Sequence, residues 1–121
     1  MNNKVKALIH RLDQMTRDGV VKWKPSVRPR YYATSFTDSS VEIGRPAEGT
    51  ASSRMGSIEL KLIDSRGNVI ERVVGVVLSP NTDAAENFQL LGSLLSAVEA
   101  VVQPGEKMAE HILAELDKIA S

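Results

Sequence analysis

Apolar side chains recur at helical spacing near both ends of this chain, and they alternate with polar side chains in between. Near the N-terminus, one helical face collects the apolar residues Val5, Leu8, Ile9, Leu12 and Met15. Gly19 follows Asp18, and glycine readily adopts the left-handed conformation that is common after a helix. The pattern therefore predicts a first helix over residues 3–18.

The middle of the chain is rich in β-branched and aromatic residues arranged in short runs, which is typical of strands. We expect strands at about residues 20–24, 30–37, 41–44, 57–64 and 69–78. Turns are expected at residues 38–40 (Asp-Ser-Ser) and 66–68 (Arg-Gly-Asn). A long Gly- and Ser-containing loop is expected over residues 44–56.

Helical spacing returns in the last third of the chain, and it predicts helices at about residues 84–102 and 105–120. A Gln-Pro-Gly break separates them. In the last helix, we expect the apolar residues Ile112, Leu113, Leu116 and Ile119 to face inward. The chain is thus predicted to be a single α+β domain over residues 1–121. It would have an N-terminal helix, a five-stranded antiparallel meander and two C-terminal helices packed on one face.

Composition narrows the classes of protein to which this chain can belong. Its 121 residues suit one domain, and the absence of cysteine excludes a disulfide scaffold, a thiol nucleophile and cysteine-ligated metals. Charged residues recur through the first six positions, which is unlike a signal peptide. No apolar stretch reaches the roughly 18 residues that a membrane span needs. We expect a cytoplasmic protein without membrane contact.

The zero net charge conceals an asymmetry along the chain. Residues 1–36 carry eight Lys and Arg against two Asp and Glu, a balance of +6, whereas residues 79–121 carry two against seven, a balance of −5. A basic front and an acidic back can attract each other within one chain or between chains.

No constellation of residues indicates catalysis or metal binding. The two histidines, His10 and His111, fall on polar helix faces, and only Glu115 stands at ligand spacing to either of them. The chain contains no nucleophile elbow, phosphate-binding loop or dinucleotide fingerprint. We expect a protein that is not an enzyme and that needs no cofactor and no metal.

The stretch from Lys22 to Tyr32 combines cations and aromatic residues with no acid, which suits an anionic, nucleotide-like ligand or single-stranded nucleic acid. The predicted ligand-binding residues are Trp23, Lys24, Arg28, Arg30, Tyr32, Arg45 and Arg54. Strand alternation places Tyr32 with Arg30 on the ligand face and Tyr31 toward the core. In the alternative interpretation, the aromatic residues are core anchors and the arginines pair with the acidic C-terminal helices.

Two features favour self-association as a homodimer. The run from Val73 to Leu78 has apolar groups on both faces, and a row of small residues follows one side of the next helix. The predicted oligomer interface consists of Val74, Val76, Gly92, Ser96 and Ala100. Packing within the chain is the alternative explanation of the small-residue row.

The order of these motifs resembles a scattered set of short, uncharacterised proteins from bacterial genomes and prophages. The resemblance rests on residues 18–19 (Asp-Gly), Trp23, residues 32–34 (Tyr-Ala-Thr), the strand at 40–43 and the strand and turn at 58–68. It implies an α+β fold and a mobile-element context, and hence an inhibitor, immunity or sequestering protein that acts by binding a protein partner. The length and helix–sheet–helix order are also similar to secretion chaperones, which are α/β homodimers. Those proteins usually have an acidic balance and a helix between strands, whereas this chain has zero net charge and five consecutive predicted strands.

Overall fold

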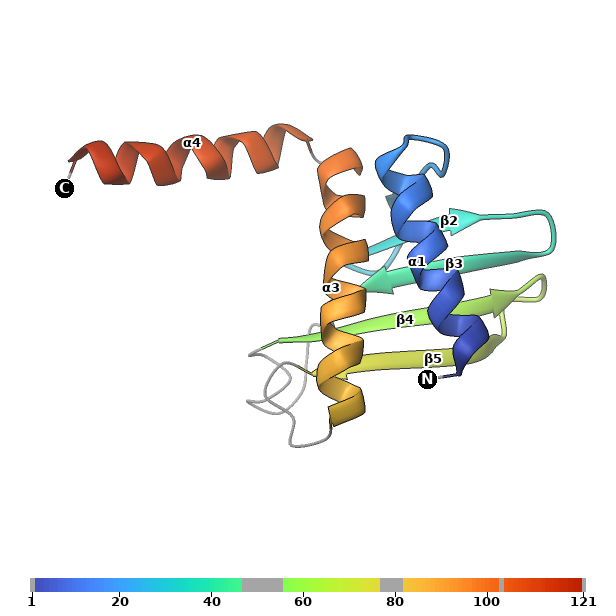
Figure 1. Cartoon of the computed structure of the whole chain (residues 1–121). Coiled ribbons are helices and arrows are strands. Elements are labelled where there is room, and N and C mark those ends of the chain that lie inside the picture. The colour runs from blue at the N-terminus through green and yellow to red at the C-terminus, as the bar shows by residue number, and fades with distance from the viewer. Residues whose placement is uncertain (1, 47–55, 77–81, 103, 121) are drawn as a thin grey trace.

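The computed structural model describes residues 2–46, 56–76, 82–102 and 104–120. In chain order, these residues form helix α1 (Asn3–Arg17), strands β1 (Lys24–Pro25), β2 (Tyr31–Ser35), β3 (Ser39–Gly44), β4 (Ser57–Asp64) and β5 (Val69–Val76), and helices α3 (Thr82–Val102) and α4 (Pro104–Ala120). Each strand pairs antiparallel with the next, so the sheet order is β1-β2-β3-β4-β5 (Figure 1). The predicted α+β class and order of elements are confirmed.

The first strand differs most from its prediction, because it covers Lys24 and Pro25 instead of residues 20–24. The side chains of Val21 and Trp23 are buried in the hydrophobic core, so this segment packs against other elements before it reaches the sheet. Strand β2 is also shorter than expected, whereas β5 begins at the predicted residue and residues 77–78 lie outside the described residues. Most of the predicted 44–56 loop lies outside them as well.

Helix α1 ends where the sequence predicts, and the cause is a backbone motif built on Gly19. The N–H groups of Gly19 and Val20 donate to the carbonyls of Thr16 and Met15 at 3.1 and 2.9 Å. Gly19 has a φ of 77°, a left-handed conformation in which a glycine carries no steric cost. This pair of bonds is the Schellman arrangement, which satisfies carbonyls at a helix end and reverses the chain toward the sheet.

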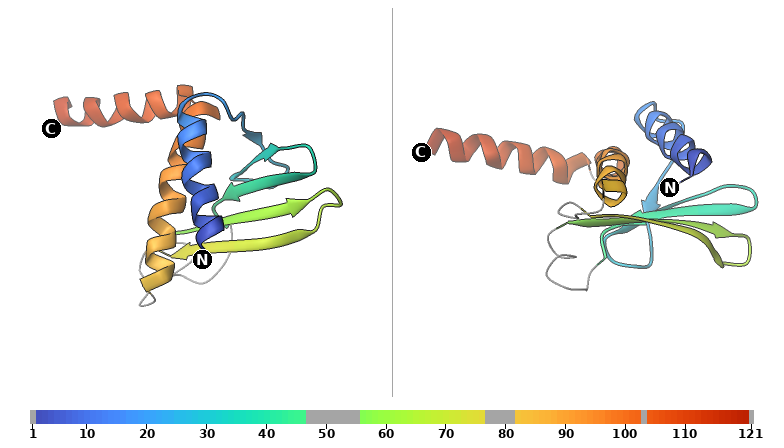
Figure 2. Two further views of the ribbon diagram at one scale, coloured as in Figure 1. Left: turned by 45° about the vertical axis from the view of Figure 1, so that its right-hand side comes forward. Right: turned by 60° about the horizontal axis from the view of Figure 1, so that its bottom comes forward.

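Helices α1 and α3 lie side by side on one face of the sheet and enclose the core (Figures 1 and 2). Across the middle of that face, cross-strand pairing aligns one residue from each of four strands, namely Tyr32, Ile43, Leu60 and Val73. Gly75 continues this face along β5, where α3 crosses so closely that a Cβ would overlap the backbone of Phe88. The inner face of the sheet is therefore closed by two helices.

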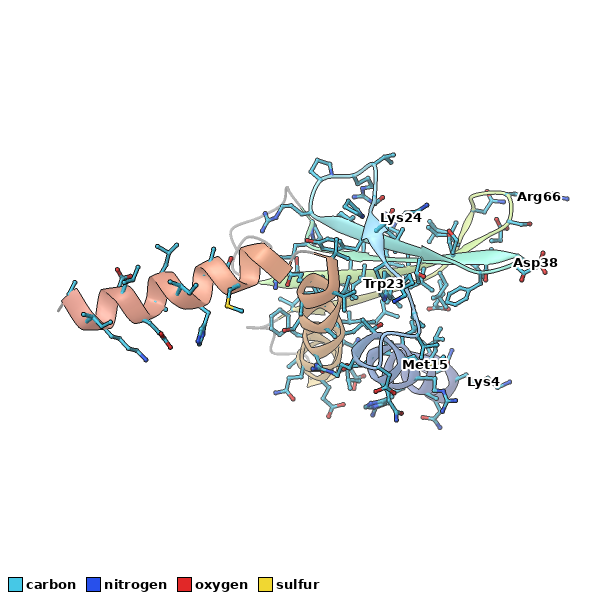
Figure 3. All side chains as sticks on the ribbon, turned by 90° about the horizontal axis from the view of Figure 1, so that it is seen from above. Lys4, Met15, Trp23, Lys24, Asp38 and Arg66 are labelled. Carbon is cyan, nitrogen blue, oxygen red and sulfur yellow. The ribbon has the colours of Figure 1, made fainter. Side chains whose placement is uncertain are left out.

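Helix α4 corrects the expectation that both C-terminal helices pack inward. It leaves the end of α3 and projects away from the sheet and from α1, and Gly105 and all residues from 108 to 120 are exposed (Figures 2 and 3). Ile112, Leu113, Leu116 and Ile119, expected to face inward, are 47–80% exposed. The inner face of the sheet is already occupied by α1 and α3, so it offers α4 no place.

Candidate functional site

A pocket of about 390 Å³ lies between the β1–β2 connection and the C-terminal half of α3. Its charged and aromatic lining residues are Arg28, Arg30, Tyr31, Tyr32, Arg45 and Glu99. We call it the arginine pocket. It brings together four of the seven predicted ligand residues, from two segments of the chain that meet because β2 pairs with β3.

A tight turn presents Arg30 to this pocket. The N–H of Tyr31 donates to the carbonyl of Arg28 at 3.3 Å, with Pro29 and Arg30 at the two central positions. Arg30 has a φ of 68°, which a type II turn requires at its third residue and which usually selects glycine. A large side chain in this conformation costs about 1–3 kcal/mol, and such strain is found preferentially at functional positions.

The turn is also held by the residue that follows strand β3. The N–H of Arg45 donates to the carbonyl of Arg30 at 3.2 Å, which joins the two arginine segments through their backbones. Gly44 makes this close approach possible, because a Cβ there would overlap the carbonyl of Arg30 and the ring of Tyr31. The spacing of Arg30 and Arg45 is thus held by main-chain contacts.

The three guanidinium groups differ in their contacts. Arg28 lies over the ring of Tyr31, 4.2 Å from its centroid, and stands 3.7 Å from the Glu42 carboxylate. The side chains of Arg30 and Arg45 make no hydrogen bond or ion pair with any residue that the structure describes. As far as the described residues go, two guanidinium groups in this pocket are therefore available to an anion.

The two tyrosines correct the prediction that Tyr32 faces a ligand and Tyr31 the core. Tyr32 is 7% exposed and belongs to the core cluster, although its edge contributes to the pocket wall. Tyr31 is buried on the opposite face of the sheet, where its hydroxyl donates to Glu59 at 2.8 Å. The prediction extended the strand alternation back to Arg30. Arg30 lies in the turn before β2, so its direction does not determine which face of the sheet Tyr32 occupies.

Three further predicted ligand residues lie outside the pocket lining. Trp23 is buried between α1 and the sheet, and its indole N–H donates to the hydroxyl of Thr16 at 2.9 Å (Figure 3). Lys24 is exposed on the edge strand but does not line the pocket. Arg54 lies outside the described residues. For Trp23, the interpretation as a core anchor is therefore the correct one.

A cluster of charged side chains lies on the outer face of the sheet, beneath the β1–β2 connection. It consists of Arg28, Glu42, Glu59, Lys61 and Arg72, and we call it the ionic cluster. The Lys61 ammonium stands 3.6 Å from Glu42 and 3.5 Å from Glu59, and Arg72 stands 3.1 Å from Glu59. The side chains of both glutamates and of Lys61 are no more than 12% exposed, so these pairs are largely withdrawn from water.

The ionic cluster contacts residues that line the arginine pocket. Glu42 accepts a hydrogen bond from the Ser26 hydroxyl at 2.8 Å and faces Arg28, so it ties the first half of the β1–β2 connection to the sheet. Burial, helped by the hydrogen bond to Glu59, raises the pKa of Tyr31 to about 12. The Tyr31 hydroxyl therefore keeps its proton, and its bond to Glu59, at neutral pH.

Sequence reasoning missed this cluster, although its signal was present. Glu59 and Lys61 alternate with the apolar residues of β4, so they share the outward face. Antiparallel pairing then sets Glu42 opposite Lys61, whereas Arg72 pairs diagonally with Glu59 at 3.1 Å. Opposite charges at facing positions are a recognised stabilising pattern, but using it requires the strand register.

The residues predicted for an oligomer interface fall on two different surfaces. Val74 is 40% exposed on the outer face of β5, since neighbouring Val73 points into the core. Ser96 and Ala100 are exposed on α3, which covers the inner face. Gly92 is half-buried beside Ile58 in the core. One flat interface cannot include Val74 and the α3 row together.

Comparison with family models, curated proteins and solved structures gives no match for this chain. Within residues 2–46, 56–76, 82–102 and 104–120, no helix is long and apolar enough to cross a membrane. The same residues contain no group of three or more His, Cys, Asp or Glu side chains that could hold a metal ion. What the arginine pocket can bind is therefore inferred from its own geometry.

Proposed function

We propose that this chain is a small, non-catalytic, cytoplasmic protein that binds an anionic, phosphate-bearing ligand of nucleotide type in the arginine pocket. The observation that carries the proposal is the pair of guanidinium groups of Arg30 and Arg45, which have no partner among the described residues and are held at one pocket by main-chain bonds. Guanidinium groups match phosphate oxygens in a bidentate geometry. A volume of about 390 Å³ lies in the range of small-ligand sites.

The burial of the aromatic residues favours recognition of the phosphate over recognition of a stacked base. Trp23, Tyr31 and Tyr32 are all buried, so none of them offers an open ring face beside the arginines. Proteins that bind single-stranded nucleic acids use such open faces for successive bases. We therefore favour a nucleotide-like small molecule over a nucleic-acid strand.

A calorimetric titration at low salt, with ADP, ATP and pyrophosphate as separate probes, tests this proposal. Because a hydrogen bond to a charged group contributes about 1.5–3 kcal/mol, Arg30→Ala or Arg45→Ala should weaken binding by about ten- to a hundredfold. Lys24→Ala is the matched control, because it removes a nearby positive charge that does not line the pocket. If no probe binds the unmodified protein, or if Lys24→Ala has the same effect, the arginine pocket is not the site.

A second candidate function is favoured by a different observation. The exposed apolar residues of α4 suit a homodimer that binds a protein partner as an inhibitor, immunity or chaperone-like protein, in the mobile-element context implied by the sequence resemblance. Large exposed apolar surfaces on small proteins commonly mark protein contacts. Both surfaces lie toward the C-terminal end of α3, but the pocket is lined by residues of α3 and the β1–β2 connection and not by α4, so the two candidate functions are compatible with each other.

A further inference from the structure

Helix α4 stands clear of its own domain (Figures 1 and 2), and its apolar residues fall on one continuous stripe along the helix. Its large members, 47–80% exposed, are Met108, Ile112, Leu113, Leu116 and Ile119. Charged residues occupy the other side, where His111 pairs with Glu115 at 3.3 Å. A helix with this division normally buries its stripe against another element. We call this surface the α4 stripe.

The centre of the stripe has the spacing of a two-helix seam. Ala109, Ile112, Leu116 and Ile119 follow one another at intervals of three, four and three residues. This is the alternation of the two inward positions in a coiled coil. It is also symmetric about the middle of the helix, so an antiparallel copy presents the same intervals in return.

We propose that the α4 stripe binds the α4 stripe of a second copy of this chain in antiparallel orientation. In that pairing, Ala109 lies opposite Ile119 of the partner subunit, and Ile112 lies opposite Leu116 of the partner subunit. Small and large side chains therefore face each other at the ends, and two large ones meet in the middle. The inference rests on the self-association proposed above and assigns it to a surface that the sequence prediction did not include.

The shape of the protomer favours a second copy over its own domain as the occupant. The inner face of the sheet is already covered by α1 and α3, and α4 leads away from both (Figure 2). An antiparallel pair would hold the two domains at opposite ends of the paired helices, where they do not collide. Nothing in the described part of the protomer has to move for this pairing to form.

The size of the interface sets its expected strength. Stable interfaces use about 20–30 residues from each side, whereas α4 has 17, of which about half can face a partner. The contact between two α4 helices is therefore smaller than a standard interface. We expect a weak dimer that forms at micromolar concentration and dissociates on dilution.

Light scattering on the full chain, from low micromolar to submillimolar concentration, tests the pairing. The mass should rise from 13.2 kDa toward twice that value. Leu116→Glu should raise the dissociation constant by about tenfold or more, because it places a charge in the seam. Ala114→Glu is the matched control on the opposite side of α4 and should leave the mass unchanged. Circular dichroism should show the same fold for both variants, because both positions are exposed.

Cross-linking tests the orientation, and the absence of native cysteine makes it specific. Chains carrying Ala109→Cys mixed with chains carrying Ile119→Cys should form a disulfide-linked dimer on mild oxidation. Ala109→Cys alone should not, because two copies of position 109 would stand about 15 Å apart along antiparallel helices, beyond disulfide reach.

Three results would overturn the inference. A monomeric mass at all concentrations excludes self-association. A dimer that persists in Leu116→Glu assigns the interface to another surface, while leaving self-association itself intact. Cross-linking of Ala109→Cys alone indicates parallel pairing. Ligand binding by the arginine pocket is measured separately, so none of these results bears on it.

Discussion

Replacing Lys61 with methionine should destabilise the domain far more than the loss of an ordinary surface lysine. Lys61 is the cation between two buried carboxylates, 3.6 Å from Glu42 and 3.5 Å from Glu59. Removing one partner from a buried ion pair costs about 3–5 kcal/mol, because the other charge remains without compensation. Arg72 stays at Glu59 and Arg28 stays near Glu42, so we expect a loss at the lower end, about 3 kcal/mol.

Urea unfolding at neutral pH measures this loss. With a slope of about 2 kcal/mol per molar urea, the midpoint should fall by about 1.5 M. Lys24→Met is the control, because Lys24 is an exposed lysine on the same sheet, and it should change the free energy of unfolding by less than about 0.5 kcal/mol. Adding Glu42→Gln to Lys61→Met should recover part of the stability, because it removes a carboxylate left without its cation. A loss below about 1 kcal/mol, typical of solvent-exposed pairs, would show that water screens the cluster and would refute this reasoning.

Three other substitutions test single contacts of the fold. Tyr31 has a folded-state pKa of about 12 against 10.0 for a free tyrosine, so the stability it contributes is complete below pH 10 and is lost as the pH rises toward 12. Ultraviolet titration should show a late ionisation that is absent in Tyr31→Phe. Gly75→Ala should lower stability by about 3 kcal/mol, measured by thermal unfolding, since its Cβ would overlap the backbone of Phe88. Trp23→Phe should cost about 1–3 kcal/mol in the same assay by leaving the buried Thr16 hydroxyl without its indole donor, and an unchanged melting temperature would contradict that bond.

Periodicity along the chain was enough to predict most of the architecture. The helical spacing of α1, its glycine stop and the alternation in β4 are local signals, and the structure places these elements within a residue of their predicted bounds. The segment at residues 20–24 failed as a strand because burial of Val21 and Trp23 under the helices outweighed their strand preference. The burial of a residue by distant parts of the chain cannot be predicted from a short stretch of sequence.

The candidate site was predicted only in part, because some of its features depend on the tertiary structure. The cationic character of Arg28, Arg30 and Arg45 can be read from the chain, and the pocket does collect them. The faces of Tyr31 and Tyr32 depend on where strand β2 begins, and one left-handed residue at Arg30 shifts that point. In α4, the pattern identifies an apolar stripe, but the expectation that it faces inward failed because α1 and α3 already cover the inner face of the sheet, which only the structure shows.

The order of the sheet has a consequence for how the chain folds. Every strand pairs with its neighbour in sequence, so the sheet can assemble hairpin by hairpin with little loss of chain entropy. The contact between α1 and α3 is different, because the hydrogen bond from Ser93 to Asp13 joins residues 80 positions apart. We expect this contact to form after the folding barrier, so substitutions at Ser93 should mainly speed unfolding, whereas substitutions in the β3–β4–β5 meander should mainly slow folding. The packing of helix α1 would then determine the unfolding rate, and the meander would determine the folding rate.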